Sequence, residues 1–416
     1  MHRSRRSVLS WVMCVAAVML GCALTPPAAH AAKIEIEVWH RWTGAQQEVL
    51  QEVLKRFEAK QADIAVKDVS VSGEYVDLMQ KILARYAAKQ TPPDVLLPGY
   101  NFFNYTIQEL HPTPIDEVAG AEAKSVYARY SPSVLKIGQV GGKQYGLPFG
   151  LSAAVLYLNP KLIEAAGLNI QTPPRTWAEV QTWGETIKKK TGKSALYISN
   201  PDTFLMQSLI ESAGGQFLQD GCPKFNSPDA VSAMEMWRKS YQDGLIPRIT
   251  YRELEQSFTA GDVAMVATSI MHLRSWSQQA QFPVKTAMLP RFGDKPLRAA
   301  AGGAALMVLA QAKERQRAAW ELLKFMASEE AMRIWIKTGY LNPLQASVPQ
   351  IDGQAPAYAA VPSLVGWVSW PGSRGLEVDK RVLNWRDKIL FGEVGTKEGL
   401  DKAVAEVAPL LPGCSR

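Results

Sequence analysis

Cysteine and histidine are scarce in this chain of 416 residues, which contains 4 cysteines and 5 histidines. No C-x-x-C pair occurs, and no cluster of His and Cys has the spacing of metal ligands. The motifs H-E-x-x-H and G-x-S-x-G are absent, and Gly302-Gly303 is not followed by the G-K-[ST] of a phosphate loop. We therefore expect no metal, no cofactor and no catalytic residues. The alternative is an enzyme whose carboxylates meet only on folding, such as a glycosidase or a lyase.

Long apolar runs are absent beyond the N-terminus, where three arginines precede a mostly apolar stretch over 8–20. Ala29-His30-Ala31 then supplies a small-x-small cleavage pattern, and together these features predict a signal peptide over 1–31. The apolar stretch is too short and wrongly flanked for a stable membrane span. No later segment approaches eighteen consecutive apolar residues, so we expect no membrane anchor in the mature chain.

The leader leaves two questions of export open. Ser4-Arg5-Arg6-Ser7-Val8-Leu9 resembles a twin-arginine signal, which implies export after folding, but an ordinary Sec signal can hold the same two arginines. Gly21-Cys22 offers lipidation at the cysteine, although the residues before it form an imperfect lipobox. We expect cleavage after Ala31 and a free periplasmic protein rather than a lipoprotein.

The mature chain of about 385 residues is long enough for two sizeable hydrophobic cores. Its charges are mixed: 46 basic and 39 acidic residues give the full chain a formal charge of +7, part of which lies in the leader. Lys188-Lys189-Lys190 is the one basic cluster, and a solvated helix face explains it better than nucleic-acid binding does. Cys222 and Cys414 remain in the mature chain, either as one disulfide or as two free thiols.

Hydrophobic periodicity switches repeatedly between that of strands and that of helices. Residues 33–39 alternate as in a strand, and Leu50, Val53, Leu54 and Phe57 then form one apolar helix face. This alternation predicts a βαβ-type, mainly parallel sheet and places the chain in the α/β class. Further strands are predicted at 64–71, 94–97, 196–199, 261–266 and 304–310, and further helices at 75–88, 204–213, 228–243 and 318–326.

The stretch 143–177 reads KQYGLPFGLSAAVLYLNPKLIEAAGLNIQTPPRTW, in which Thr176 is a good helix N-cap. This order resembles extracellular solute-binding proteins of ABC importers, family 1, in the branch that binds glycerol 3-phosphate and sugars. Four further segments carry the same resemblance: Val38-Trp39-His40, and residues 261–267, 301–306 and 338–343.

The resemblance implies a two-lobed periplasmic-binding-protein fold of type II, with a ligand cleft between lobes that are joined by hinge crossings. Lobe one is then 32–150 plus 302–341, and lobe two is 152–300 plus 342–416. The crossings are expected near 151–154, 299–303 and 340–344.

The implied function is capture of a small ligand by hinge closure in the periplasm and its delivery to inner-membrane ABC permease subunits. Glycerol 3-phosphate or a glycerophosphodiester is one expected ligand, and a neutral mono- or oligosaccharide is the alternative. We expect a monomer that is not an enzyme and binds no nucleic acid. A signalling receptor without a permease partner would be a third class.

Trp39 and Trp42 follow the first strand, where α/β folds place ligand loops. The resemblance adds ligand contacts from Tyr75, Ser152, Ser269, Gly303 and Tyr340. The chain departs from that branch in two places, with Tyr100 where the branch has an acid and Phe204 where it has tryptophans. The arginine that holds the anion in that branch corresponds to Arg374, which we prefer because it precedes a helix in a Gly-flanked loop, or to Arg381.

Overall fold

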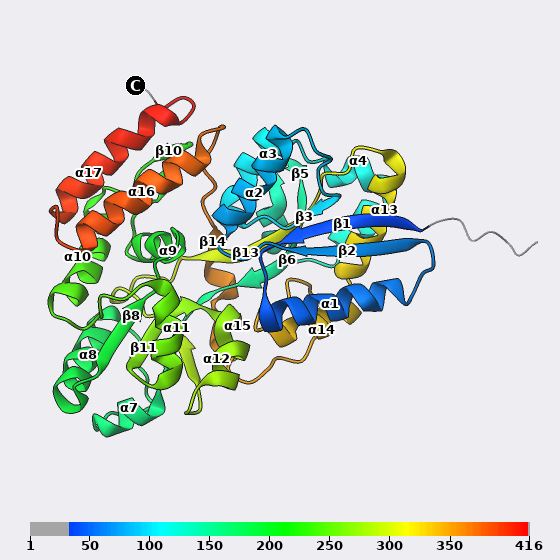
Figure 1. The fold of residues 1–416 in the computed structure, drawn as a ribbon. Coiled ribbons are helices and arrows are strands. Elements are labelled where there is room, and N and C mark those ends of the chain that lie inside the picture. Colours follow the sequence, from blue (N-terminus) through cyan, green and yellow to red (C-terminus); the bar gives the residue numbers. More distant parts are fainter. Residues whose placement is uncertain (1–32, 415–416) are drawn as a thin grey trace, which may run out of the picture.

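The computed structural model describes residues 33–414, and the predicted signal peptide lies outside them. The described chain forms two sheets, each covered by its own helices (Figure 1). The first sheet has six strands in the order β14-β13-β3-β1-β2, with β6 paired to β13. These strands are β1 (Ile34–His40), β2 (Ile64–Ser70), β3 (Val95–Leu96), β6 (Gly146–Ser152), β13 (Ala299–Val308) and β14 (Leu364–Gly366).

Strands β1, β2 and β3 are parallel to one another, as the alternation of the N-terminal segments predicts. Strand β13 runs antiparallel to both β3 and β6, so the complete sheet is mixed. Helices α2 and α3 lie on one side of the sheet in Figure 1, and α1 and α14 lie on the other. The helices of this part are α1 (Gly44–Glu58), α2 (Tyr75–Ala87), α3 (Phe103–Leu110), α4 (Ile115–Ala119), α5 (Ala123–Tyr127), α6 (Pro132–Leu135), α13 (Lys313–Met326) and α14 (Glu329–Trp335), with a small ribbon of β4 (Gln139–Val140) and β5 (Lys143–Gln144).

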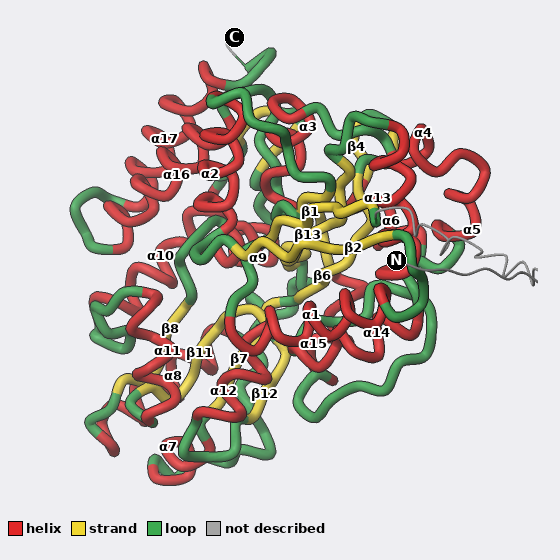
Figure 2. The backbone as a smooth tube through the Cα atoms, turned by 45° about the vertical axis from the view of Figure 1, so that its right-hand side comes forward, coloured by secondary structure: helices red, strands yellow, loops and turns green. Residues whose placement is uncertain are grey.

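The second sheet has four strands in the order β12-β7-β11-β8, and Figure 2 shows them grouped apart from the first sheet. They are β7 (Ala154–Leu158), β8 (Ser194–Ile198), β11 (Val263–Ser269) and β12 (Lys285–Met288). The helices of this part are α7 (Pro160–Ala165), α8 (Trp177–Thr191), α9 (Phe204–Ser212), α10 (Pro228–Gln242), α11 (Tyr251–Ala260), α12 (Leu273–Gln279), α15 (Ala355–Ala360), α16 (Gly375–Leu390) and α17 (Thr396–Val407), with a ribbon of β9 (Leu218–Gln219) and β10 (Cys222–Pro223).

Local sequence signals place the ends of several of these elements. Helix α8 begins after Thr176, whose hydroxyl accepts from the Glu179 N–H at 3.2 Å while the Glu179 carboxylate accepts from the Thr176 N–H at 3.1 Å. This capping box satisfies two backbone donors that would otherwise lack partners, and it confirms the predicted N-cap. Within 33–414, none of the helices combines the length and the apolar character needed to cross a membrane.

The segments predicted to cross between lobes lie side by side. Ser152 ends β6 and pairs with Gly302, while the Leu341 N–H donates to the Leu151 carbonyl at 2.8 Å. Strand β13 begins at Ala299, five residues before the predicted start, because the glycine pair lies inside the strand rather than in a turn before it. The assignment of every residue to one lobe or the other stays a prediction.

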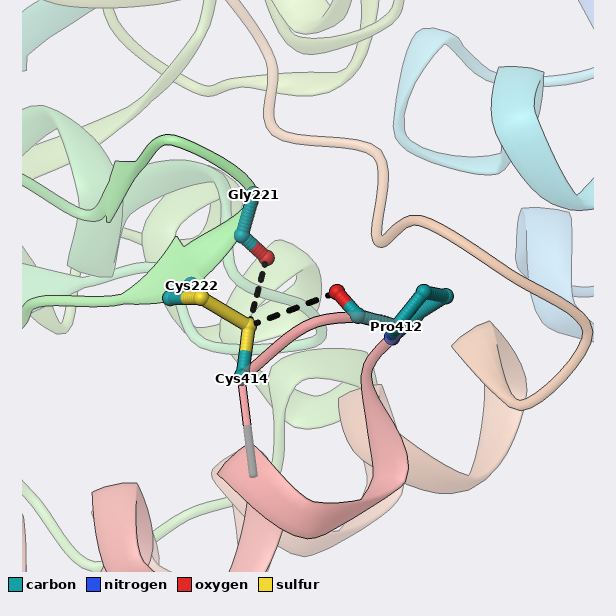
Figure 3. The surroundings of a disulfide bond; sticks show 4 residues. All are labelled: Gly221, Cys222, Pro412 and Cys414. Atoms are coloured by element: carbon teal, nitrogen blue, oxygen red, sulfur yellow. Dashed lines mark hydrogen bonds between the residues drawn. A yellow bond between two sulfur atoms is a disulfide. The ribbon is translucent and has the colours of Figure 1, made fainter. Parts of the chain in front are cut away.

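The two cysteines of the described chain form a disulfide, which the sequence left open. Cys222 in β10 is bonded to Cys414 after α17, with 5.5 Å between their Cα atoms (Figure 3). Helices α16 and α17 pack on each other and on α10 (Figure 1). The bond therefore fastens the C-terminal helical pair to the part of the chain that carries the second sheet.

Candidate functional site

A narrow cavity lies between the two sheets and receives side chains from both. Its volume is about 40 Å³, room for roughly three water molecules, so its walls lie close together in this structure. One wall and the hinge contribute Arg41, Glu74, Tyr75, Ser152, Gly302, Gly303 and Tyr340. The opposite wall contributes Ser199, Pro201, Asp202, Phe204, Tyr251, Thr268, Ser269, Met271 and Trp367.

The loop after β1 is fixed in a way that presents Arg41 to the cavity. The Trp42 N–H donates to Nδ1 of His40 at 3.1 Å, and the other ring nitrogen of His40 is hydrogen-bonded to Asp68 at the end of β2. The Ser70 hydroxyl donates to the carbonyl of Trp42 at 2.6 Å. These bonds tie the loop to two parallel strand ends, the edge at which α/β sheets place ligand loops.

Arg41 is already paired within its own wall. Its Nη2 lies 2.9 Å from Oε2 of Glu74, and its Nε donates to the carbonyl of Gly73 at 2.9 Å. Its guanidinium carbon lies 5.0 Å from the ring centroid of Tyr75, a cation–π contact. Burial acts to lower the pKa of Arg41, but the carboxylate of Glu74 acts in the opposite direction and the pKa is raised. The pair thus contributes polar atoms but little net charge.

Asp202 faces this pair from the opposite wall. Its Oδ1 accepts from the Phe204 N–H at 2.9 Å, and its carbonyl accepts from Nη1 of Arg386 at 2.9 Å. The side chain is half-buried, and its desolvation is the largest of the causes that raise its pKa to about 7. The negative charge of Glu74 raises the pKa further, and Arg386 opposes the shift.

Aromatic rings form much of the remaining lining. Tyr340 stacks on Trp335 with 5.3 Å between centroids, and its hydroxyl accepts from Nε1 of Trp42 at 3.0 Å. On the other wall the rings of Phe204 and Trp367 lie 5.3 Å apart. Such faces pack against C–H surfaces of a ligand while nearby polar atoms bind its hydroxyls.

Two hydroxyls of the cavity differ in how they are bonded. The Tyr251 hydroxyl is hydrogen-bonded to Nε2 of His272 at 2.6 Å, and burial lowers the pKa of His272 to about 3, so this imidazole is neutral. The Tyr75 hydroxyl is buried and makes no hydrogen bond of ordinary geometry with the described residues, although the Tyr340 hydroxyl lies near it. Because buried polar groups are normally satisfied, the free hydroxyl of Tyr75 marks a position for a ligand atom.

The structure brings together six of the residues expected to contact ligand. All six line the cavity: Tyr75, Ser152, Phe204, Ser269, Gly303 and Tyr340. Trp42 lies one layer behind, bonded to Tyr340. Trp39 lies away from the cavity, where its Nε1 donates to Glu37 at 3.1 Å. Tyr100 donates to the Gly150 carbonyl at 2.9 Å and does not line the cavity either.

The two arginines expected to hold an anion do not reach the cavity. Nη2 of Arg374 lies 2.7 Å from Glu377, one helical turn further on, and half of the Arg374 side chain is exposed. Arg381 is paired with Glu377 at 2.6 Å and with Glu406 at 2.5 Å. Both guanidinium groups therefore belong to ion pairs of α16 and α17, and the cation of the cavity is Arg41.

The sequence interpretation missed Arg41, Glu74 and Asp202, the charged residues of the lining. A signal existed, since Arg41 follows β1 and Asp202 follows β8, both at carboxyl ends of strands. A larger hollow of about 570 Å³ adjoins the cavity, and Glu74, Tyr75, Pro201 and Asp202 line both. Its outer wall is α16, so a ligand longer than the cavity has a path between the walls.

This two-sheet architecture, with hinge strands between two walls that share one cavity, defines a two-lobed solute-binding fold. Residues 52–363 match the family model described as bacterial extracellular solute-binding protein. The match covers well over half of the chain, and the chain belongs to this family. The resemblance seen in the sequence and the predicted two-lobed fold are thereby confirmed.

The individual relatives of known name have low sequence identity to this chain. The sn-glycerol-3-phosphate-binding periplasmic protein UgpB of Yersinia pestis bv. Antiqua (strain Antiqua) is 24% identical over 371 residues, which is 83% of this chain and 82% of the relative. The protein of that name from Rhizobium meliloti (strain 1021) is 23% identical over 402 residues, covering 90% and 93%.

Solved structures share the fold at lower identity. The GacH receptor of Streptomyces glaucescens GLA.O, solved unliganded and with acarbose, has a TM-score of 0.80 at 19% identity, covering 92% of this chain and all of that chain. UgpB of Mycobacterium tuberculosis with glycerophosphocholine has a TM-score of 0.79 at 19% identity, covering 90% and 97%.

Proposed function

We propose that this protein is the substrate-binding component of an ABC importer, and that its ligand is a carbohydrate or polyol rather than a phosphate monoester. It is exported to the periplasm, closes its two walls around one ligand, and delivers the ligand unchanged to inner-membrane permease subunits. A ligand that contacts Tyr75 on one wall and Phe204 on the other favours the closed arrangement, because only that arrangement makes both contacts.

The charge balance of the cavity is the observation that supports this ligand class. Among the described residues that line it, Arg41 is the one cation, and two carboxylates, Glu74 and Asp202, accompany it. A phosphate monoester near neutral pH would bring about two further negative charges into a site of low dielectric. Sugar hydroxyls instead donate to carboxylates, and sugar C–H faces pack on aromatic rings.

A glycerophosphodiester is the second candidate, favoured by the presence of Arg41 and by relatives named for glycerol 3-phosphate. A phosphodiester carries one negative charge, so Arg41 could hold it if the guanidinium left Glu74. Glycerol 3-phosphate, the ligand that the resemblance put forward first, fits the carboxylates of this cavity least well.

Calorimetry on the purified protein separates these ligands, with glucose, maltose, trehalose, glycerol 3-phosphate and glycerophosphocholine as titrants. We expect one bound saccharide per chain, and a phosphate monoester that binds more weakly than every saccharide that binds. Tightest binding of glycerol 3-phosphate would refute the proposal. Mass spectrometry of the recovered ligand tests the receptor class, because two carboxyl residues, Glu74 and Asp202, line the cavity and glycosidases act with two carboxyl groups. Steady cleavage of a bound glycoside would make the protein an enzyme.

A further inference from the structure

The charges that line the cavity do not cancel. Arg41 and Glu74 form an ion pair at 2.9 Å, which leaves Asp202 as the charge without a counter-ion in the described lining. The nearest cation behind Asp202 is Arg386, whose Nη1 donates to the Asp202 carbonyl while Nε and Nη2 donate to Asp387 at 2.9 and 2.7 Å. Arg386 is thus occupied elsewhere, and the Asp202 carboxylate faces the cavity without a partner of opposite charge.

The hydrogen bonds of Asp202 are also incomplete. Its Oδ1 accepts one backbone N–H, from Phe204, and its Oδ2 has no hydrogen-bond partner in the part of the chain that the structure describes. A carboxylate has about four lone-pair positions to satisfy. Across the cavity, the Tyr75 hydroxyl is likewise without a partner, and Tyr75 is only 6% exposed. Oδ2 of Asp202 is therefore free to accept, and the Tyr75 hydroxyl to form, a further hydrogen bond with a ligand.

Aromatic faces beside Asp202 suit a cation. Phe204 and Trp367 pack together, with 5.3 Å between their centroids, and Nε1 of Trp367 is held by Thr203 at 3.1 Å. The face of Tyr75, on the other wall, is already covered by the Arg41 guanidinium, whereas Phe204, Trp367 and Tyr251 line the cavity from the wall of Asp202. An ammonium group gains both from an unpaired carboxylate and from neighbouring π-faces.

From these three observations we infer that the ligand is a carbohydrate with a protonated amino group, which Asp202 binds, while hydroxyls of the same ligand bind Tyr75 and the Arg41–Glu74 pair. This inference rests on the proposed function and narrows it to amino sugars. It assigns Asp202 as the residue that distinguishes an amino sugar from the corresponding neutral sugar.

The inference has a consequence for pH. Besides burial, the charges that act on Asp202 are Glu74 from the opposite wall and Asp379 and Arg386 from α16, and Tyr251 is the titratable neighbour from α11. The net effect raises the pKa of Asp202 to about 7. An ammonium binds the ionised carboxylate, so its affinity rises between about pH 6 and about pH 7 as Asp202 loses its proton. A neutral sugar that needs the protonated acid shows the opposite trend.

Matched pairs of sugars test the inference on the native protein. Glucose and glucosamine, galactose and galactosamine, and cellobiose and the glucosamine dimer are titrated by calorimetry at about pH 7. In each pair that binds, we expect the amino member to bind at least about tenfold more tightly. Asp202→Asn should abolish this preference, so that the amino and the neutral member of each pair then bind with equal affinity. Glu211→Gln, which removes a mostly buried carboxylate outside both the cavity and the adjoining hollow, is the control and should keep the preference.

The possible failures are distinguishable. Neutral sugars that bind as tightly as their amino counterparts would overturn the inference and leave the proposed function intact. The same holds if Asp202→Asn melts like the native protein but retains the preference. If Asp202→Asn does not fold, the pairwise comparison on the native protein still decides. Binding of glycerophosphocholine without binding of any sugar, amino or neutral, would overturn the proposed function and the inference together.

Discussion

Gly303 should be the least replaceable residue of the hinge, and alanine tests this directly. Its φ of 120° lies where side chains are strained, and an added Cβ would lie 1.8 Å from the carbonyl oxygen of Gly150. That oxygen belongs to the backbone of β6, the strand that pairs with β13, so it cannot rotate away. The clash would force the two hinge strands apart.

The cost can be worked from these two terms. A non-glycine residue in such a backbone region costs about 1–3 kcal/mol, and overpacking a rigid environment costs about 1–3 kcal/mol more. We expect Gly303→Ala to lower the free energy of unfolding by about 2–6 kcal/mol. Urea unfolding followed by tryptophan fluorescence measures this, since rings such as Trp42 and Trp335 are buried close to the hinge.

The neighbouring glycine provides the control. A Cβ at Gly302 would meet the Ser152 hydroxyl at 2.5 Å and the Phe204 ring at 3.0 Å, both side-chain atoms that can move. Gly302→Ala should therefore cost less than about 2 kcal/mol, while it narrows the cavity at two lining residues. Equal unfolding midpoints for the two variants, or a Gly303→Ala protein as stable as the native one, would refute the reasoning.

Three further predictions follow from the bonds and charges described above. Replacing Cys222 and Cys414 with serine opens a loop with a sequence separation of 192 residues, which should lower the free energy of unfolding by about 5 kcal/mol in the chain-entropy model; thiol labelling of the unreduced, denatured native protein should find no free thiol. Asp202 has a pKa of about 7 in the folded protein, above its unfolded value, so the native state holds the extra proton and its stability falls as pH rises from about 4 to about 7. Asp202→Asn removes this loss and should stabilise the unliganded protein at pH 8, by at least about 1 kcal/mol relative to its effect at pH 4; a pH-independent difference in melting temperature would contradict it. Arg41→Met removes the partner of Glu74, whose side chain is one third exposed, and should weaken saccharide binding by at least about thirtyfold, whereas Arg374→Met at the surface should leave saccharide affinity unchanged by calorimetry; equal losses would show that the cavity cation was wrongly assigned.

Local patterns were sufficient to predict most elements of the fold. Periodicity predicted α9 and α10 within one residue of their bounds at both ends, and the N-cap at Thr176 followed from residue types alone. Strand β13 was predicted too short because a pair of glycines usually marks a turn. Here Gly303 is required inside the strand, where β6 approaches too closely for a side chain. That contact joins segments about 150 residues apart, and no local pattern contains it.

The site was predicted only in part, because some of its contacts also join segments that lie far apart in the sequence. Ser152 and Tyr340, which the sequence led us to expect at the site, line the cavity, and their contact with a ligand stays a prediction. Arg374 was preferred as the anion-binding residue because it lies in a Gly-flanked loop before α16. In the structure its guanidinium forms an ion pair with Glu377, three residues later. Whether Asp202 has a partner of opposite charge depends on how the two walls pack against each other. The local sequence of either wall does not predict that packing.

The disulfide also fixes an order of events in the making of the protein. Cys222 lies near the middle of the chain and its partner follows 192 residues later, so the bond cannot close until nearly all of the second wall has been synthesised. Throughout that interval Cys222 lacks its native partner, and oxidation could join its thiol only to some other thiol. Correct oxidation is therefore a terminal step of maturation. The fraction of bonded molecules therefore records how many chains have brought Cys414 to Cys222.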